Sequence, residues 1–147
     1  MKEKEYSRDK RSPVPSNKNI SKIMSHNKAK NTRPELLVRK AFWKNGFKGY
    51  RLHPKNIPGK PDIAFIKKKI AIFVNGCYWH RCPICNYSVP KSNTEFWENK
   101  FSKNVERDKK KINELEILGW KVITIWECEL KSSSYQNILL KLQKVFT

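Results

Sequence analysis

The sequence is short of acidic residues and of long apolar runs. Only 13 Asp and Glu residues stand against 32 Lys and Arg, which gives a formal net charge of +19 over 147 residues. Such self-repulsion is tolerated when a polyanion is the usual neighbour, so nucleic acid is the expected partner. No apolar stretch approaches the ~20 residues of a membrane span, and the first residues lack the apolar core of a signal peptide. We therefore expect a cytoplasmic protein without membrane association.

Internal repeats and low-complexity segments are also absent, and the length suits one domain. Hydrophobic residues make up 38% of the chain and aromatic residues 12%, which is enough for a modest core and excludes global disorder. Residues 1–30 are basic and polar and show neither helical nor strand periodicity. We expect them to form a disordered arm, either a solubilising tail or a segment that becomes ordered on DNA, before a folded domain over residues 31–147.

Hydrophobic periodicity and capping signals predict the order of helices and strands. The first helix is expected over residues 34–45, because Thr32 can cap its amides, Pro34 suits the first turn and Glu35 can complete a capping box. Short strands are predicted at 49–53, 62–66, 70–75 and 121–127, and further helices at 94–118, with a break near Ser102, and at 135–146. This order predicts an α/β fold in which a central mixed sheet is flanked by helices.

Cysteine is scarce, but its spacing is informative. Cys82 and Cys85 form a CxxC motif, Cys77 lies shortly before it, and Cys128 ends the last predicted strand. Disulfides are uncommon in a reducing compartment, which leaves metal binding or burial. Four thiolates around one Zn²⁺ make a closed structural site, suited to a loop with little core of its own. A redox pair and inert buried thiols are the alternatives.

One carboxylate and one imidazole are candidates for hydrolytic chemistry. Asp62 follows Pro61 at the mouth of a predicted β-hairpin surrounded by lysines, where it can hold Mg²⁺ against a phosphate. His80 lies in a loop near the same end of that hairpin, and imidazole can take a proton from water near neutral pH. The alternatives are an ordinary turn aspartate and a structural histidine.

Aromatic residues are interleaved with lysines around the cysteine loop. Tyr78 and Trp79 precede His80, and Phe96 and Trp97 begin the long predicted helix. Aromatic rings in a basic setting can stack on bases or wedge into a base step. We expect Trp79 and Trp97 to contact DNA and Phe96 to lie in the core.

Together these segments resemble the very short patch repair (Vsr) DNA mismatch endonucleases. The match runs in order through NTRPEL, LH, PGKPDI, FVNGCYWH, TEFW, NVERD, GW and WEC, between about residues 24 and 131. The resemblance implies a restriction-endonuclease-like fold with catalytic Mg²⁺ and structural Zn²⁺. It also implies an enzyme that nicks DNA on the 5′ side of the mispaired thymine at a T:G mismatch, which initiates repair of deaminated 5-methylcytosine.

The resemblance assigns a role to each matching position. Asp62 is implied to bind Mg²⁺, with the Val74 carbonyl completing its shell, His80 to act as general base, and Glu35 to lie near the hydrated metal. Asn75 stands where the best-known members carry histidine, which bears on the cleavage rate. The implied DNA wedges are Tyr78, Trp79 and Trp97, and the implied zinc ligands are Cys77, Cys82, Cys85 and Cys128.

The function expected from these residues is a monomeric, Mg²⁺-dependent nicking endonuclease acting on mismatched double-stranded DNA, with mismatch-repair proteins as candidate partners. One alternative is a less selective DNA nuclease of the same fold. Another is a non-catalytic, zinc-containing nucleic-acid-binding module. Asp62 and His80 discriminate, because a pure binding module needs neither.

Overall fold

The computed structural model describes residues 30–131 and 136–146, so the arm expected over residues 1–30 lies almost wholly outside the described residues. A four-stranded sheet with the order β1-β2-β3-β4 forms the centre. Its strands are β1 (Arg51–Leu52), β2 (Ile63–Phe65), β3 (Ile70–Asn75) and β4 (Lys121–Trp126). The pairs β1–β2 and β2–β3 are antiparallel, whereas β3 and β4 are parallel. The mixed sheet predicted from the sequence is therefore confirmed.

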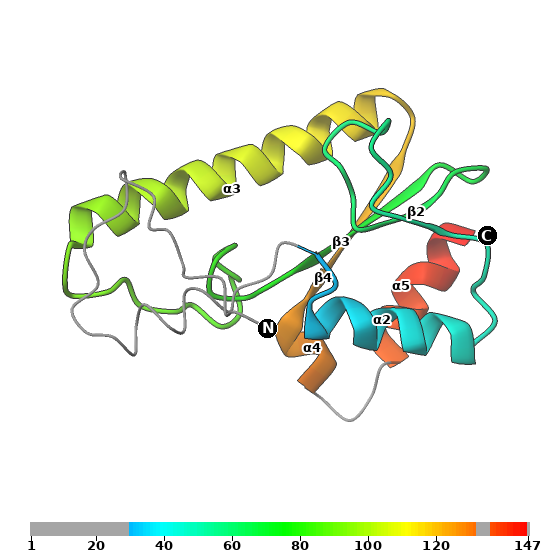
Figure 1. Cartoon of the computed structure of the whole chain (residues 1–147), viewed down its shortest axis with the longest axis horizontal. Helices are drawn as coiled ribbons and strands as arrows, with labels where there is room; N and C mark the ends of the chain where they lie inside the picture. The colour runs from blue at the N-terminus through cyan, green and yellow to red at the C-terminus, as the bar shows by residue number, and fades with distance from the viewer. Residues whose placement is uncertain (1–29, 132–135, 147) are drawn as a thin grey trace, which may run out of the picture.

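Helices cover both faces of this sheet (Figure 1). They are α2 (Arg33–Lys44), α3 (Thr94–Ile117), the short α4 (Glu127–Lys131) and α5 (Gln136–Phe146). Among the described helices, α3 packs over one face, while α2 and α5 pack over the other. None of the described helices is long and apolar enough to cross a membrane.

Strand β3 is the centre of the core because all its residues are buried. Side chains alternate along a strand, so Ile72 and Val74 pack toward α2 and α5, with Phe42 and Leu142. Phe73 points to the opposite face and packs with Leu115 of α3. A strand buried on both faces reads as a continuous apolar run, which explains why its boundaries are predicted correctly.

Several boundaries differ from the sequence prediction. Helix α3 is continuous through Ser102, because it contacts the cysteine loop on both sides of that position, through Phe101 before it and Asn104 after it. Strand β4 ends at Trp126, whose N–H donates to Glu129 Oε1 (3.2 Å), and the chain turns into α4. Cys128 therefore lies on a short helix and not at the end of a strand. Tyr135, predicted to begin the last helix, lies outside the described residues.

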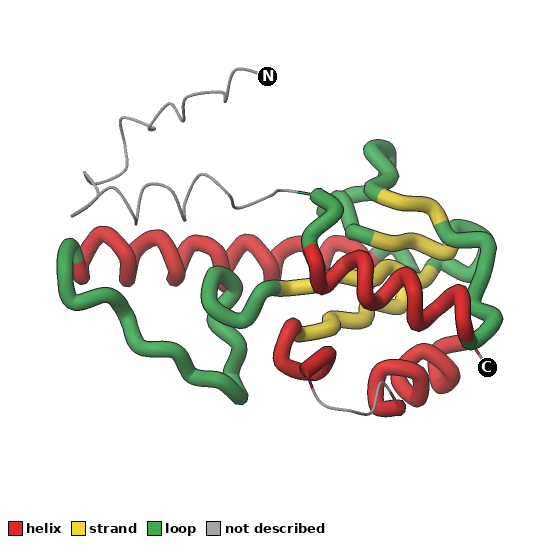
Figure 2. The backbone as a smooth tube through the Cα atoms, turned by 60° about the horizontal axis from the view of Figure 1, so that its bottom comes forward, coloured by secondary structure: helices red, strands yellow, loops and turns green. Residues whose placement is uncertain are grey.

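The N-terminal half of α3 extends beyond the sheet (Figure 2). The segment between β3 and α3 contains neither helix nor strand and runs out beside this overhang. We call residues 76–93 the cysteine loop. Because the sheet does not reach it, the loop must be held by side chains of α3 and by its own cysteines.

Candidate active site

A cleft of about 610 Å³ opens where β3 ends, between the start of α2, the cysteine loop and α3. The carboxyl end of a strand is a common position for a functional site in an α/β fold. The cleft is lined by Thr32, Arg33, Pro34, Glu35, Lys60, Asp62, Phe73, Val74, Asn75, Gly76, Trp79, His80, Asp108, Lys111 and Glu127. The structure thus brings together all four residues predicted to be catalytic, which are Glu35, Asp62, Asn75 and His80.

Glu35 is a carboxylate buried at the start of α2. Its backbone N–H donates to Thr32 Oγ1 (3.4 Å), as in the predicted capping box. Its Oε2 accepts the N–H of Asn31 (3.0 Å), one residue before the helix cap, and not that of Thr32. Only 2% of the residue is exposed. Arg39, one turn further along α2, donates to the same oxygen (3.2 Å). Burial of this charge is therefore compensated by a cation and by the helix N-terminus.

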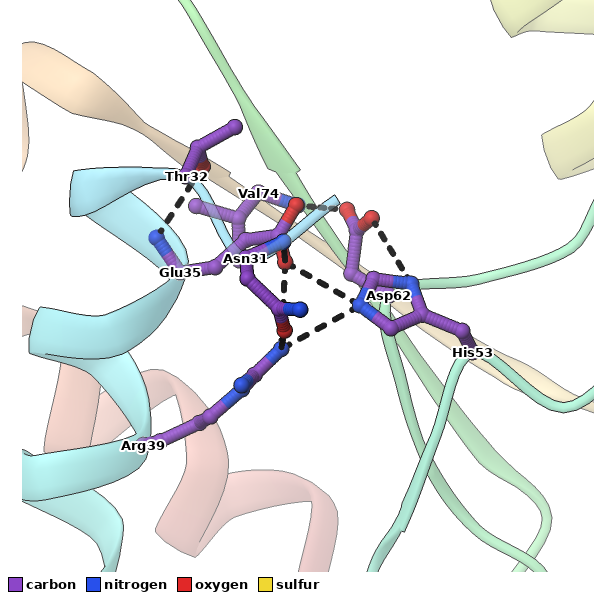
Figure 3. A network of polar contacts seen from close by, with 7 residues as sticks. All are labelled: Asn31, Thr32, Glu35, Arg39, His53, Asp62 and Val74. Carbon is purple, nitrogen blue, oxygen red and sulfur yellow. Dashed lines mark hydrogen bonds and ion pairs between the residues drawn. The ribbon is translucent and has the colours of Figure 1, made fainter. Parts of the chain in front are cut away.

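Asp62 and Glu35 lie close together, and His53 contacts both of them (Figure 3). Its Oδ2 accepts the N–H of Val74 (2.8 Å), which fixes the carboxylate against the end of β3. His53 lies with Nδ1 3.8 Å from Asp62 Oδ1 and Nε2 3.2 Å from Glu35 Oε2. Burial raises the pKa of Asp62 to about 6, and the nearby carboxylate of Glu35 adds to this shift. The hydrogen bond from Val74 lowers the pKa and so opposes the shift.

Glu35, His53 and Asp62 form a donor set that fits a divalent cation. Each offers one ligand atom, and these atoms lie within 4.8 Å of one another. Two carboxylates at this separation repel, and a cation between them relieves that repulsion. The N–H of Val74 is used by Asp62, so Val74 borders the same site.

His80 is held by α3. Its Nδ1 lies 2.6 Å from Asp108 Oδ2, and its backbone N–H donates to Gly76 O (3.2 Å). Asn104, one turn before Asp108, donates to the carbonyl of Trp79 (3.2 Å). A carboxylate on Nδ1 favours the tautomer whose Nε2 is free of a proton, which is the form that can accept one. The side chain of His80, which borders the cleft, is therefore able to accept a proton at Nε2.

Asn75 is 8% exposed and lies on the face of β3 that points toward α3. Its neighbours in the cleft are Asp108 and Lys111. An amide there adds no charge to the site.

The predicted DNA wedges belong to one aromatic cluster between the cysteine loop and α3. Trp79 borders the cleft, with its ring centroid 5.9 Å from that of Trp97. Trp97 is only 9% exposed and stacks on Phe101 at 5.8 Å. Tyr78 packs edge-on against Phe101 at 5.4 Å. Of the three predicted wedges, Trp79 is therefore the one that lines the cleft, whereas the buried ring of Trp97 packs against Trp79.

The core position expected for Phe96 is wrong. Phe96 is partly exposed, and Trp97 takes the buried place. The physical reason is the helical period, since residues 97 and 101 are four apart and share the face that meets the loop. Phe96 lies at the margin of that face, edge-on to Trp97 at 5.2 Å.

The four cysteines converge beside this cluster. Their sulfur atoms lie within 4.8 Å of one another, with Cys82 Sγ 3.8 Å from Cys128 Sγ. Sulfur ligands arranged tetrahedrally at ~2.3 Å from zinc are roughly 3.8 Å apart, so this spacing is that of a zinc site. None of the four cysteines forms a disulfide in the structure. The cluster is therefore consistent with a structural zinc site.

The surroundings shift the pKa values of these thiols in both directions. Burial raises the pKa of Cys77 to about 12 and also raises that of Cys128. In Cys82, burial opposes ionisation, but the backbone N–H groups of Cys85 and Ile84 prevail and lower its pKa. Several thiolates this close repel one another unless a cation joins them.

Other residues of the site had no role in the sequence predictions. The pairing of Leu52 with Ile63 places His53 opposite Asp62. Aligning these two predicted strands residue by residue could therefore have identified His53 as a neighbour of Asp62. Arg39 follows Glu35 at helical spacing, which marks an ion pair.

Arg81 had no such signal in the sequence. It lies over the ring of Phe101 (4.3 Å) and donates to the carbonyls of Tyr78 and Tyr87. Asp108 and Lys111, which both lie on α3, also line the cleft, and neither was assigned a role from the sequence.

Comparison with known proteins identifies the family. A family model described as DNA mismatch endonuclease Vsr matches residues 13–85. The chain is 48% identical over 106 residues to the type II nicking enzyme V.NmeAIP of Neisseria meningitidis serogroup A, covering 72% of this chain and 75% of that protein. It is 40% identical over 108 residues to the type II nicking enzyme V.XorIIP of Xanthomonas oryzae pv. oryzae, covering 74% and 79%.

A further relative is the DNA mismatch endonuclease Vsr of Escherichia coli K12, which is 42% identical over 82 residues. This match covers 56% of the chain and 53% of that protein. The longer alignment to the Neisseria enzyme, at 48% identity, extends over most of the chain. The chain belongs to the Vsr family and is a DNA nicking endonuclease.

Proposed function

We propose that this endonuclease nicks one strand of double-stranded DNA on the 5′ side of the mispaired thymine at a T:G mismatch, and so initiates very short patch repair of deaminated 5-methylcytosine. The observation that supports this proposal is that Trp79 and the hydrogen-bonded pair His80–Asp108 line the same cleft. A ring able to enter a weakened base step is thereby joined directly to a base able to activate water. The E. coli relative is named a DNA mismatch endonuclease.

Asp62 and Glu35 are the residues that would hold Mg²⁺, with His53 beside them and the Val74 carbonyl as a further oxygen. Their separation, within 4.8 Å, and their opposed carboxylates support this choice. Mg²⁺ bound there would neutralise the phosphate and lower the pKa of the attacking water. Arg39 holds Glu35 from the other side, so the carboxylate keeps its position before substrate arrives.

His80 supplies the base. As the water oxygen attacks phosphorus, Nε2 takes the water proton, and Asp108 stabilises the resulting imidazolium through Nδ1. The bond from phosphorus to the leaving ester oxygen breaks, and that oxygen takes a proton from solvent. One strand is thereby cut, with no covalent intermediate.

Mismatch preference would come from stacking and not from charge. The net charge of +19 favours any duplex, matched or not. A T:G wobble pair costs less to unstack than a matched pair, and a ring entering the step exploits that difference. Trp79 is suited to this because Trp97 and Phe101 support it from behind.

The general-base role makes a quantitative prediction. We expect His80→Ala to lower the single-turnover nicking rate by ~10²–10⁴-fold, the range that a positioned base supplies. Asp108→Asn should also slow the reaction, because the amide cannot stabilise the imidazolium. Rapid-quench assays with saturating T:G duplex measure both rates. An unchanged rate in His80→Ala would move the base elsewhere.

The stacking role predicts a change in selectivity. We expect Trp79→Ala to reduce the ratio of T:G to C:G binding, measured by fluorescence anisotropy, while affinity for the matched duplex changes much less. Trp43→Ala is the matched control, since Trp43 is 58% exposed and its ring contacts Lys48 outside the cleft. Trp97→Ala would also destabilise the fold, because this ring is buried. Equal losses for both duplexes would make Trp79 a general stacking platform.

A less selective nicking endonuclease is the second candidate. It is favoured by the names of the Neisseria and Xanthomonas relatives, which are type II nicking enzymes. A nicking enzyme serving a restriction system would use the same cleft with a different substrate preference.

Strand-labelled duplexes distinguish the two candidates. The enzyme is incubated with T:G and C:G duplexes of the same sequence, each with Mg²⁺ and with EDTA. The proposed function predicts one product, cut 5′ of the mispaired thymine, from the T:G duplex with Mg²⁺. Comparable nicking of the C:G duplex would favour the second candidate, and nicking in EDTA would contradict the metal assignment.

A further inference from the structure

We infer that Lys111 is a catalytic residue that contacts the scissile phosphate. This inference rests on the proposed function only in taking the cleft as the active site, and it does not depend on mismatch preference. Lys111 lines the main cleft and also an adjoining cavity of about 10 Å³, which Phe73, Asn75 and Asp108 share with it.

The stem of Lys111 is held in place by a close approach of the backbone. A Cβ at Gly59 would lie 3.1 Å from Cβ and 3.3 Å from Cγ of Lys111, so only glycine fits without a shift. The same point lies 3.5 Å from Cζ of Phe73. The side chain is therefore packed against the segment that leads to Asp62, near the ring of Phe73 on β3. A packed stem limits where the ammonium can go.

Burial distinguishes Lys111 from the other cations of the cleft. Arg33 and Lys60 are exposed, whereas Lys111 is half-buried. Among the lysines whose burial the structure describes, only Lys100 shares that property, and Lys100 lies over the aromatic cluster. Within residues 30–131 and 136–146, the ammonium of Lys111 has neither an ion-pair nor a hydrogen-bond partner.

The cleft needs a cation on this side. Its lining includes four carboxylates, which belong to Glu35, Asp62, Asp108 and Glu127. Strand β3 supplies no positive charge, since it reads IAIFVN and ends in the neutral Asn75. Lys111 enters from α3, one turn after Asp108, whose partner is His80. A phosphate placed for attack by a water at His80 is therefore close to this ammonium.

The role that follows is electrostatic. Negative charge grows on the non-bridging oxygens of the phosphate as the water attacks and the ester bond breaks. The ammonium of Lys111 donates an N–H to one of these oxygens and keeps its proton throughout. The water proton still goes to His80. Lys111 thus acts on the transition state without adding a proton-transfer step.

Substitution of Lys111 tests the role, with a neighbouring lysine as control. Lys111→Met keeps most of the packed stem and removes the charge, and Lys110→Met removes an exposed charge from the same helix. We expect Lys111→Met to lower the single-turnover rate at saturating DNA by ~10²–10³-fold, with DNA affinity and melting temperature close to wild type. Lys111→Arg should recover part of the rate, and Lys110→Met should change only the salt dependence of binding.

Sulfur substitution of the scissile phosphate gives a readout that a structural role would not move. If Lys111 donates to one non-bridging oxygen, replacing that oxygen by sulfur should slow wild type more than Lys111→Met, for one diastereomer only. Equal effects of sulfur in both proteins would overturn the contact, as would a wild-type rate in Lys111→Met. Loss of nicking in Asp62→Ala, measured alongside, confirms the cleft independently. Nicking of matched DNA by wild type would overturn the mismatch proposal and leave this one standing.

Discussion

Replacement of Asp62 by Ala is expected to abolish nicking, lowering the single-turnover rate by roughly 10³-fold or more. Asp62 is proposed to hold the catalytic cation together with Glu35, and no other carboxylate can take its place against the N–H of Val74. DNA binding and folding should change little, because removing the carboxylate relieves its repulsion with Glu35.

Two measurements accompany this prediction. Anisotropy with T:G duplex is expected to give an affinity near wild type, and thermal melting a midpoint at or above wild type. Asp62→Asn should be inactive as well, since the amide keeps the shape but not the charge. Glu116→Ala, on an exposed position of α3, is the control for loss of an acidic side chain and should nick normally. Full Mg²⁺-dependent cleavage by Asp62→Ala would falsify the assignment.

Replacement of Cys82 by Ser is expected to remove zinc and to lower the melting midpoint by about 10 °C or more. The wild-type protein should contain one Zn²⁺ per chain. Nicking should be lost too, because Trp79 and His80 lie between Cys77 and Cys82, and the cysteine loop has no helix or strand of its own. Metal analysis and calorimetry of protein purified without chelators measure both effects.

Ile84→Ala is the matched control for the zinc prediction. Ile84 lies inside the same CxxC motif but is 77% exposed, so its removal should change neither zinc content nor stability. Cys128→Ser should behave like Cys82→Ser, even though Cys128 is far away in the sequence, since its sulfur lies 3.8 Å from that of Cys82. Absence of zinc from the wild-type protein would rule out this account of the cluster.

The site combines two carboxylates whose burial is unfavourable alone. Glu35 is 2% exposed and depends on Arg39 and on the first turn of α2, while burial raises the pKa of Asp62 to about 6. Stability would be served better by an apolar pair in the same places. The arrangement therefore indicates a functional requirement for negative charge at the end of β3.

Much of the fold follows from the sequence because its signals are local. Thr32 and Glu35 cap α2 through hydrogen bonds within a few residues, and β3 is recognised as an apolar run. The CxxC motif likewise predicts a metal knuckle from spacing alone. Asp62 and His80 are chosen as candidates on their chemistry and their positions at turns. These inferences need no knowledge of how distant elements pack.

Only the tertiary structure decided which side chains meet across elements. Asp108 reaches His80, and Lys111 enters the cleft, because α3 crosses the sheet at one particular rotation and offset. The same rotation buries Trp97 in place of Phe96. His53 joins Glu35 to Asp62 only once β1 is paired with β2 and α2 is docked beside them. Helical periodicity determines which residues share a face, but the direction of that face is set by packing against the sheet, which no local pattern in the sequence contains.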